Sequence, residues 1–317
     1  MKKILIAGGA GFIGTRFCVE NSSKYDITVV DNFWFGDKLP NNIIKRKMNI
    51  RDLTSNDLKG FDAVLFMGGL SNDPMAMYRP DLNFIENSAI PTYLAFLTKE
   101  AGIRRFIGAS SCSVYGHTKN KTLTETSLVK PSYASGISKL QCERGITILE
   151  DDSFKPILFR KGTVGGWSPR MRFDLVVNTM LMTAFTKKKI IVNSPKLWRP
   201  LIDIRDVVQG YVHAIESDEE ISGVYNLSGG NYTIGDLGKI IHNELYELGY
   251  DIELEYLDIK DVRNYKVKTS KALDELDFTS SYTPKDSIKE ILQNINIETF
   301  NFKDKQYYNI ETFKNII

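Results

Sequence analysis

A glycine-rich turn near the N-terminus constrains the fold of this chain more than any other part of its sequence. The turn Gly8–Gly14 directly follows the mostly apolar run Lys2–Ala7, and a second apolar run, Ile27–Val30, ends at Asp31. The order of strand, glycine turn, helix, strand and acid is the arrangement that binds a dinucleotide in parallel α/β folds. A chain with this order is therefore expected to build a parallel sheet with a nucleotide at its edge.

The residues of the turn have separate physical roles. Gly8 permits the tight turn, Gly11 lets the backbone approach a pyrophosphate, and Gly14 lets the first helix pack closely on the strand. The pyrophosphate would lie on the exposed N–H groups at the N-terminus of that helix. Asp31 follows Gly14 by 17 residues, close to the spacing of about 20 for the acid that binds an adenosine ribose hydroxyl. Because a carboxylate repels a 2′-phosphate, the sequence favours NAD over NADP.

The composition argues against several classes of protein. Of the 317 residues 42% are hydrophobic and 25% charged, and the formal net charge is +2, so no strong field favours nucleic acid or a membrane surface. No apolar stretch approaches the roughly 18 residues of a membrane span, and the apolar run after Lys3 is too short for a secretory signal. The three cysteines are too few for a disulfide framework, and the three isolated histidines show no metal spacing. We expect a cytoplasmic protein without a bound metal.

Strand-like and helix-like segments alternate along the first half of the chain. Helical patterns near 81–101 and from 131 to about 149 separate three apolar strands, Ala63–Met67, Ile103–Ala109 and Pro156–Arg160. This alternation predicts an α/β fold with a doubly wound, Rossmann-type parallel sheet. In such a sheet, ligands bind at the carboxyl ends of the strands. The second half is less regular and predicts a smaller C-terminal α/β lobe.

The expected domains follow from this alternation. Residues 1–165 form the NAD-binding domain, which also receives a strand and a helix from about 200–228. Residues 166–199 and 229–317 form the substrate-binding lobe and the tail. The last part of the tail, 294–317, is rich in Asn, Phe and Tyr and has no assigned role.

Several further segments carry a recognisable pattern. They are Asn49–Leu53 (NIRDL), Ala109–Gly116 (ASSCSVYG), Pro131–Lys139 (PSYASGISK), Ser168–Asn178 (SPRMRFDLVVN) and Arg199–Val207 (RPLIDIRDV). Together with the glycine turn they resemble the extended short-chain dehydrogenase/reductase family, in particular its nucleotide-sugar epimerases and dehydratases of the UDP-galactose 4-epimerase kind. The resemblance covers roughly residues 1–290.

The resemblance implies an NAD-dependent enzyme that oxidises a ring hydroxyl of an NDP-sugar by hydride transfer to tightly bound NAD, as part of an epimerisation. In such enzymes a serine binds the reacting oxygen, a tyrosine phenolate takes the proton, and a lysine four residues later binds the nicotinamide ribose. Ser111 and Lys139 match the serine and the lysine. The position of the tyrosine, four residues before Lys139, holds Ser135.

Ser135 is a poor proton acceptor by itself, because an aliphatic alcohol starts from a pKa far above the value of about 10 for tyrosine. Three explanations stay open. Tyr133, six residues before Lys139, replaces the phenol if it precedes the helix and its ring turns inward. Alternatively another group acts, through a water or as Cys112, or the chain binds NAD and an NDP-sugar without catalysis. A dehydrogenase or reductase that exchanges free NAD(P)H is a further alternative.

The resemblance also bears on the type of reaction. The 4,6-dehydratases of the family carry an Asp-Glu pair just before Val-Tyr-Gly, which moves protons during the loss of water. This chain has Cys112 and Ser113 at those positions, and neither does the work of a carboxylate near neutral pH. We therefore expect an epimerase rather than a 4,6-dehydratase.

The remaining ligand contacts are also implied by the resemblance. Cofactor-binding residues are expected at Gly8, Gly11, Phe12, Ile13, Gly14, Asp31, Asn32, Asp52, Leu53, Met67, Gly68, Gly69, Asn87 and Lys139. Substrate-binding residues are expected at Ser71, Ser111, Asn178, Arg199 and Arg263. The two arginines would clamp the diphosphate through their fixed donor forks, while Arg170 and Arg172 add positive charge at the same mouth. A homodimer through the helices near 81–101 and 135–150 completes the expectation.

Overall fold

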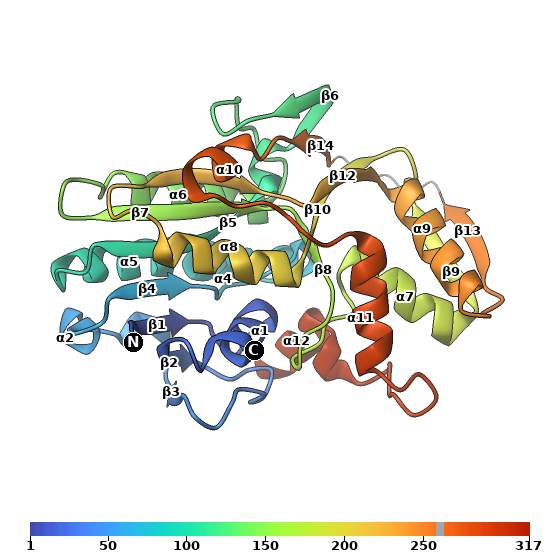
Figure 1. Ribbon diagram of the computed structural model, residues 1–317, viewed down its shortest axis with the longest axis horizontal. Coiled ribbons are helices and arrows are strands. Elements are labelled where there is room, and N and C mark those ends of the chain that lie inside the picture. The colour runs from blue at the N-terminus through green and yellow to red at the C-terminus, as the bar shows by residue number, and fades with distance from the viewer. Residues whose placement is uncertain (258–262) are drawn as a thin grey trace.

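A seven-stranded parallel sheet forms the centre of the molecule (Figure 1). The computed structural model describes residues 1–257 and 263–317. The strand order is β11-β7-β5-β4-β1-β2-β3, which confirms the predicted doubly wound fold class. The strands are β1 (Lys3–Ala7), β2 (Asp26–Asp31), β3 (Ile44–Lys47), β4 (Ala63–Phe66), β5 (Arg105–Ser111), β7 (Lys155–Lys161) and β11 (Gly223–Leu227).

Helices cover both faces of the sheet, and this explains why its central strands are almost entirely apolar. The covering helices are α1 (Phe12–Asn21) and α8 (Ile204–Glu216) on one face, and α2 (Ser55–Leu58), α5 (Ile90–Glu100) and α6 (Ala134–Thr147) on the other. Along β1, Ile4 and Ile6 pack with the first group, whereas Leu5 and Ala7 pack with the second. Two hydrophobic cores, one on each face, therefore hold the sheet between them.

The predicted helix near 81–101 is interrupted by a wider turn. The chain runs through α3 (Asp73–Tyr78) and α4 (Pro80–Phe84), makes a π-helical turn at Ile85–Ala89, and continues as α5. Such turns often occur at functional sites. This one carries Asn87, which was expected at the cofactor.

Helix α6 begins later than the sequence suggests. Pro131 was expected to open it, but Tyr133 has an extended backbone, with φ −129° and ψ 157°, and the helix starts at Ala134. Ser135 therefore lies in the first turn of α6, and Lys139 lies one turn further on. Tyr133 precedes the helix.

A smaller lobe lies beside the carboxyl ends of the central strands (Figure 1). It contains the sheets β12-β10-β8, β13-β9 and β14-β6. Its strands are β6 (His117–Leu123), β8 (Thr163–Gly165), β9 (Lys189–Asn193), β10 (Trp198–Asp203), β12 (Gly230–Thr233), β13 (Glu253–Leu257) and β14 (Asn264–Val267). Its helices are α7 (Val176–Lys187), α9 (Ile234–Glu247) and α11 (Pro284–Asn294). Helix α10 (Ser270–Leu276) packs instead against β11, at the edge of the central sheet.

The tail returns to the first half of the molecule. Its last helix, α12 (Asn309–Ile316), packs against α3. Phe313 is completely buried there, with its ring centroid 5.7 Å from that of Trp34 and 6.3 Å from that of Tyr78. The segment without an assigned role in the sequence is thus a structural part of the first half of the molecule.

Candidate active site

A cavity of about 670 Å³ lies at the carboxyl ends of β1, β4, β5 and β7, between the central sheet and the smaller lobe. Its volume is that of a site for a small organic ligand. Residues from the glycine turn line one end, and residues from β10 and α7, together with Arg263 just before β14, line the other. The position agrees with the rule that parallel α/β sheets bind ligands at the carboxyl ends of their strands.

The glycine turn brings the ends of β1 and β4 into close contact. Gly8 has a φ of +81°, and a Cβ at this position would overlap the Cα of Gly68. A Cβ at Gly14 would likewise overlap the backbone of Gly9, so Gly14 serves the packing of α1 and does not itself line the cavity. Gly11 precedes the first residue of α1, and its neighbours Phe12 and Ile13 line the cavity with it.

Asp31 is held at the end of β2 by the glycine turn itself. Its Oδ2 accepts a hydrogen bond from the Ala10 N–H at 3.0 Å, and its Oδ1 accepts one from the Phe33 N–H at 2.8 Å. Burial raises the pKa of this carboxyl, and the two backbone N–H groups oppose that rise. Asp31 and Asn32 both line the cavity, which is the position expected of residues that bind an adenosine ribose.

Asn87, at the same edge of the sheet, has one side-chain hydrogen bond acceptor that the described residues do not pair. Its Nδ2 donates to the carbonyl of Leu70 and to Oδ1 of Asn83, both at 2.8 Å. Its own Oδ1 is buried and has no hydrogen-bond partner within the described ranges. A Cβ at Gly69 would overlap this oxygen. The glycine cradle, the α1 N-terminus and this unpaired acceptor together fit a dinucleotide.

Three of the four predicted catalytic residues line the cavity: Ser111, Ser135 and Lys139. Ser111 is the last residue of β5, and its Oγ accepts a hydrogen bond from the Ser113 N–H at 3.1 Å. Lys139 Nζ lies 5.8 Å from the centroid of the Phe66 ring. Desolvation lowers the pKa of this lysine, so an acceptor that pairs with it would be strongly bound.

Ser135 is hydrogen-bonded to a carboxylate. Its Oγ donates to Oδ1 of Asp73, the first residue of α3. The second oxygen of Asp73 accepts a hydrogen bond from Arg263 Nη1 at 2.7 Å. Asp73 lines the cavity beside Ser135, so the serine in the tyrosine position has a proton acceptor of its own.

Tyr133 is not among the residues that line the cavity in the described part of the chain. Its ring lies 5.8 Å from the guanidinium carbon of Arg263. It precedes the helix, as its proposed role requires, but its ring stacks on an arginine of the other lobe. Cys112 is fully buried, its Sγ donates to the carbonyl of Arg160 at 3.1 Å, and burial raises its pKa. These contacts are those of a packing residue.

Lys161 was missed by the sequence analysis. It ends β7, lies opposite Ser111 in the parallel register, and lines the cavity. Its Nζ donates to the Tyr211 hydroxyl at 3.2 Å. Desolvation, together with the nearby Lys139, lowers its pKa to about 7. The sequence shows only a single lysine at the end of an apolar strand. Because many strands end in this way, the lysine did not stand out as a site residue.

The predicted substrate residues divide into two groups. Ser71, Arg199 and Arg263 line the cavity. Arg199 is 6% exposed and donates to the carbonyls of Trp198 and Arg263. Asn178 does not line the cavity, because its amide braces the preceding loop: Nδ2 donates to the carbonyls of Gly166 and Arg172, and Oδ1 accepts from the Gly166 N–H.

Among the predicted cofactor residues, Asp52 and Leu53 also lie outside the cavity lining. Asp52 is exposed at the end of a 3-10 turn, and Leu53 is buried in the core. The neighbouring Ile50 lines the cavity instead. Asp52 does not cap α2 either, since that helix is capped by Thr54 and Asp57.

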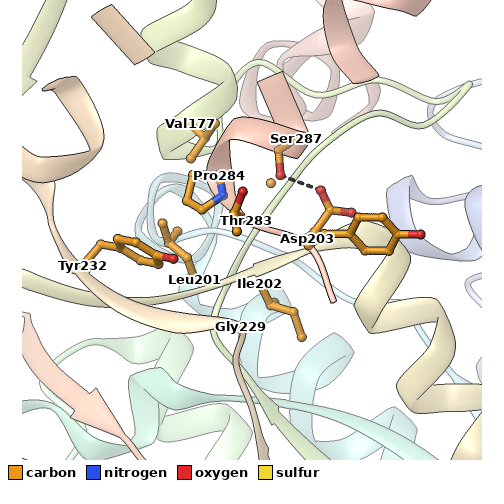
Figure 2. A pocket seen from close by; sticks show the side chains of 11 residues that line it. Val177, Leu201, Ile202, Asp203, Gly229, Tyr232, Thr283, Pro284 and Ser287 are labelled. Carbon is orange, nitrogen blue, oxygen red and sulfur yellow. Dashed lines mark hydrogen bonds between the residues drawn. The ribbon is translucent and has the colours of Figure 1, made fainter. Parts of the chain in front are cut away.

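A second, much smaller cavity of about 10 Å³ lies between β10 and the start of α11. Figure 2 shows Ser287 pointing toward Asp203, to which its Oγ donates a hydrogen bond, with Val177, Leu201 and Pro284 close by. This volume holds about one water. It is a seam between packed elements and is too small for a substrate.

The fold and the cavity define a class of protein: an α/β dinucleotide-binding protein whose second lobe closes a small-molecule site over the cofactor. The chain belongs to the NAD dependent epimerase/dehydratase family, whose sequence profile matches residues 4–228. Within the described ranges, no helix has the length and apolar character to cross a membrane.

Three similar proteins illustrate the relationship. The uncharacterised UDP-glucose epimerase YtcB of Bacillus subtilis is 27% identical over 248 residues, which are 72% of this chain and 77% of that protein. The UDP-N-acetylglucosamine 4-epimerase of Methanobrevibacter ruminantium, solved with UDP-N-acetylmuramic acid, has a TM-score of 0.83 at 22% identity, covering 93% of this chain and 99% of that one. The UDP-glucose 4-epimerase of Thermotoga maritima, solved with UDP-glucose, has a TM-score of 0.82 at 21% identity, covering 93% and 100%.

Proposed function

We propose that this protein is an NAD-dependent epimerase of a nucleoside diphosphate sugar. The observation that carries the proposal is a single cavity that runs from the glycine turn, past Ser111, Ser135 and Lys139, to the two arginines Arg199 and Arg263. When bound, NAD supplies the hydride acceptor and donor for the sugar carbon. The relatives and structural neighbours, several of which are named as acting on UDP-sugars, support a UDP-sugar as the substrate.

The proton of the sugar hydroxyl goes to Ser135, and the proton of Ser135 goes to Asp73. This relay is supported by the hydrogen bond from Ser135 Oγ to Asp73 Oδ1 inside the cavity. It resolves the weakness of serine as a base, because the proton ends on the carboxylate of Asp73, which becomes a neutral acid, and Ser135 never has to persist as an alkoxide. Arg263 pairs with the other oxygen of Asp73 and fixes the orientation of the carboxyl group. The reverse transfer returns both protons when the sugar carbon is reduced.

Ser111 and Lys139 position the reacting groups. Ser111 presents a hydroxyl to the sugar oxygen from the end of β5. Lys139 holds the nicotinamide ribose from α6, and its partly desolvated ammonium interacts more strongly there than it would in water. Arg199 and Arg263 flank the other end of the cavity, where their guanidinium groups suit a diphosphate.

The function is tested by incubating the purified protein with UDP-, GDP- and dTDP-sugars and following the products by NMR. The proposal expects inversion at one ring carbon without accumulation of NADH. Stoichiometric NADH would indicate a dehydrogenase, and binding without any product would indicate a non-catalytic sugar-nucleotide protein. Either result would overturn the epimerase proposal.

The proton relay is tested by three variants of the same enzyme. Ser135→Ala and Asp73→Asn are each expected to lower kcat by about 100- to 1,000-fold, since general acid–base catalysis contributes about that much. Tyr133→Phe is expected to stay within a few-fold of the wild type. If Tyr133→Phe abolishes turnover while Asp73→Asn does not, the phenol and not the relay takes the proton.

We also propose that residues 1–165, with about 200–228, bind NAD, that the remaining segments bind the sugar nucleotide, and that the enzyme is a cytoplasmic homodimer. The dimer is supported by apolar side chains that α5 and α6 leave exposed: Tyr93 and Phe96 are each 45% exposed, and Ile137 is 39% exposed. Light scattering should give a particle of twice the mass of the chain. The Phe96→Lys variant should give a particle with the mass of one chain.

A further inference from the structure

Arg170, in the loop between β8 and α7, has donors that no part of the described chain uses. The residue is 4% exposed and lines the cavity, yet its Nε and Nη1 have no hydrogen-bond partner within residues 1–257 and 263–317. Desolvation, with Arg172 nearby, lowers its pKa to about 9, so the guanidinium stays charged at neutral pH. A buried guanidinium whose N–H groups lack acceptors is unfavourable unless an anion pairs with it.

Two carboxylates act on Arg170, and both are engaged elsewhere. Asp174 takes both arms of Arg172, with distances of 2.8 and 3.1 Å to its two oxygens. It also accepts hydrogen bonds from Asn72 Nδ2 at 2.7 Å and from the Asn309 N–H at 3.3 Å. Asp31 accepts its hydrogen bonds from the backbone N–H groups of Ala10 and Phe33. Within the described residues neither carboxylate bonds to Nε or Nη1 of Arg170, so these two donors are left for an anionic ligand.

The groups that hold Arg170 belong to the dinucleotide end of the cavity. Its guanidinium carbon lies 4.0 Å from the centroid of Phe35, in the loop that follows Asp31. Its Nη2 donates to Oδ1 of Asn309, the first residue of α12. Asn309 in turn donates to Ser71 Oγ at 2.7 Å, just after the Gly68–Gly69 turn. The proposed clamp for the sugar diphosphate, Arg199 and Arg263, has a separate set of contacts around Tyr265 and Asp73.

We propose that Nε and Nη1 of Arg170 bind a phosphate group of the dinucleotide, and that α12 holds the guanidinium in place through Asn309. The inference rests on the proposed function, because it takes the ligand of the glycine turn to be NAD. The substrate lobe and the C-terminal tail then share one bond to the cofactor. The contact slows the release of NAD, because dissociation would leave a buried charge without this anion.

The role of α12 is supported by how firmly it is anchored. Phe313 is fully buried between Trp34 and Tyr78, and Asn309 is 4% exposed. Ile310 lines the cavity next to Asn309. The helix is therefore packed as a wall of the cofactor site, with its first turn facing the ligand.

The test measures NAD directly. Wild type, Arg170→Met, Asn309→Ala and the control Arg205→Met are purified, and bound NAD per chain, the NAD release rate and the affinity for added NAD and UDP are determined by mass spectrometry and calorimetry. Arg205 is a matched control because it also stacks on an aromatic ring, 3.7 Å from Tyr282, but does not line the cavity. Thermal unfolding without NAD checks that each variant is folded.

Arg170→Met is expected to weaken NAD binding about 10- to 100-fold, as for the loss of two charge-assisted hydrogen bonds, and to leave UDP binding unchanged. Asn309→Ala is expected to speed NAD release by a smaller factor, and Arg205→Met to change neither affinity. Wild-type affinity for NAD in Arg170→Met overturns the inference and leaves the proposed function intact, and so does a loss of UDP binding alone. A wild type that binds NAD but converts no sugar nucleotide refutes the proposed function and leaves the inference standing.

Discussion

The buried ion pair between Glu143 of α6 and Arg160 of β7 is expected to stabilise the site as a coupled unit. The pair is bidentate, with Arg160 Nε and Nη2 donating to the two carboxylate oxygens at 2.9 and 2.7 Å. Glu143 is 3% and Arg160 5% exposed. Glu143 also accepts a hydrogen bond from Ser110, the residue before the predicted catalytic Ser111. Removing one partner therefore leaves a charge buried and unpaired.

The expected magnitude follows from that burial. Glu143→Gln and Arg160→Met should each lower the free energy of unfolding by about 3–5 kcal/mol. With an unfolding entropy of about 2.1 cal/mol/K per residue, this corresponds to a fall in Tm of about 5–8 °C for a chain of this length. The double variant Glu143→Gln/Arg160→Met removes both charges and should lose less than either single variant.

Differential scanning calorimetry of the four NAD-free proteins at pH 7 measures the coupling. Circular dichroism at 25 °C confirms that each variant is folded before it is heated. If the two single losses simply add in the double variant, the partners are independent and the reasoning from buried charge is wrong. A single variant as stable as the wild type would refute it equally.

Two further predictions concern the cavity. Lys161 has a folded-state pKa of about 7 against an ordinary 10.5. Between these values the unfolded chain binds a proton that the folded chain lacks, so stability without ligand should rise with pH across that window. Lys161→Met should reduce this rise in thermal scans from pH 6.5 to 10, and the part that remains is assigned to Lys139, whose pKa burial also lowers. Gly8→Ala should eliminate bound NAD, measured after purification, because its Cβ would overlap Gly68 at a φ of +81°. Gly60→Ala, with a φ of +87° but no atom within 4 Å of the added carbon, should lose about 1 kcal/mol of stability and keep its NAD, and an equal loss of NAD in both would contradict the overlap argument.

The parts of the site that local patterns determine were predictable from the sequence. The glycine turn, the position of Asp31 and the spacing of Ser135 and Lys139 depend on neighbours within one strand or helix, and these residues lie in or beside the cavity. The late start of α6 was not predictable from Pro131. The sequence is compatible both with a helix that begins at Pro131 and with an extended Tyr133 before a helix that begins at Ala134.

The remaining features depend on contacts between distant segments. Asp73 meets Ser135 across 62 residues, and Arg170 meets Asn309 across 139. Such pairs are decided by how segments far apart in the chain pack together, and a single sequence carries no periodic signal for them. Asn178 was expected to bind the diphosphate, but its amide braces a loop. A side-chain amide suits either task, and only the tertiary packing distinguishes them.

The position of α12 has a consequence for changes made in this helix. Asn309 and Ile310 line the cavity, and Phe313 is completely buried against Trp34 and Tyr78. A substitution that unpacks Phe313 would therefore open one wall of the cavity and expose apolar surface, although it touches no strand of the central sheet.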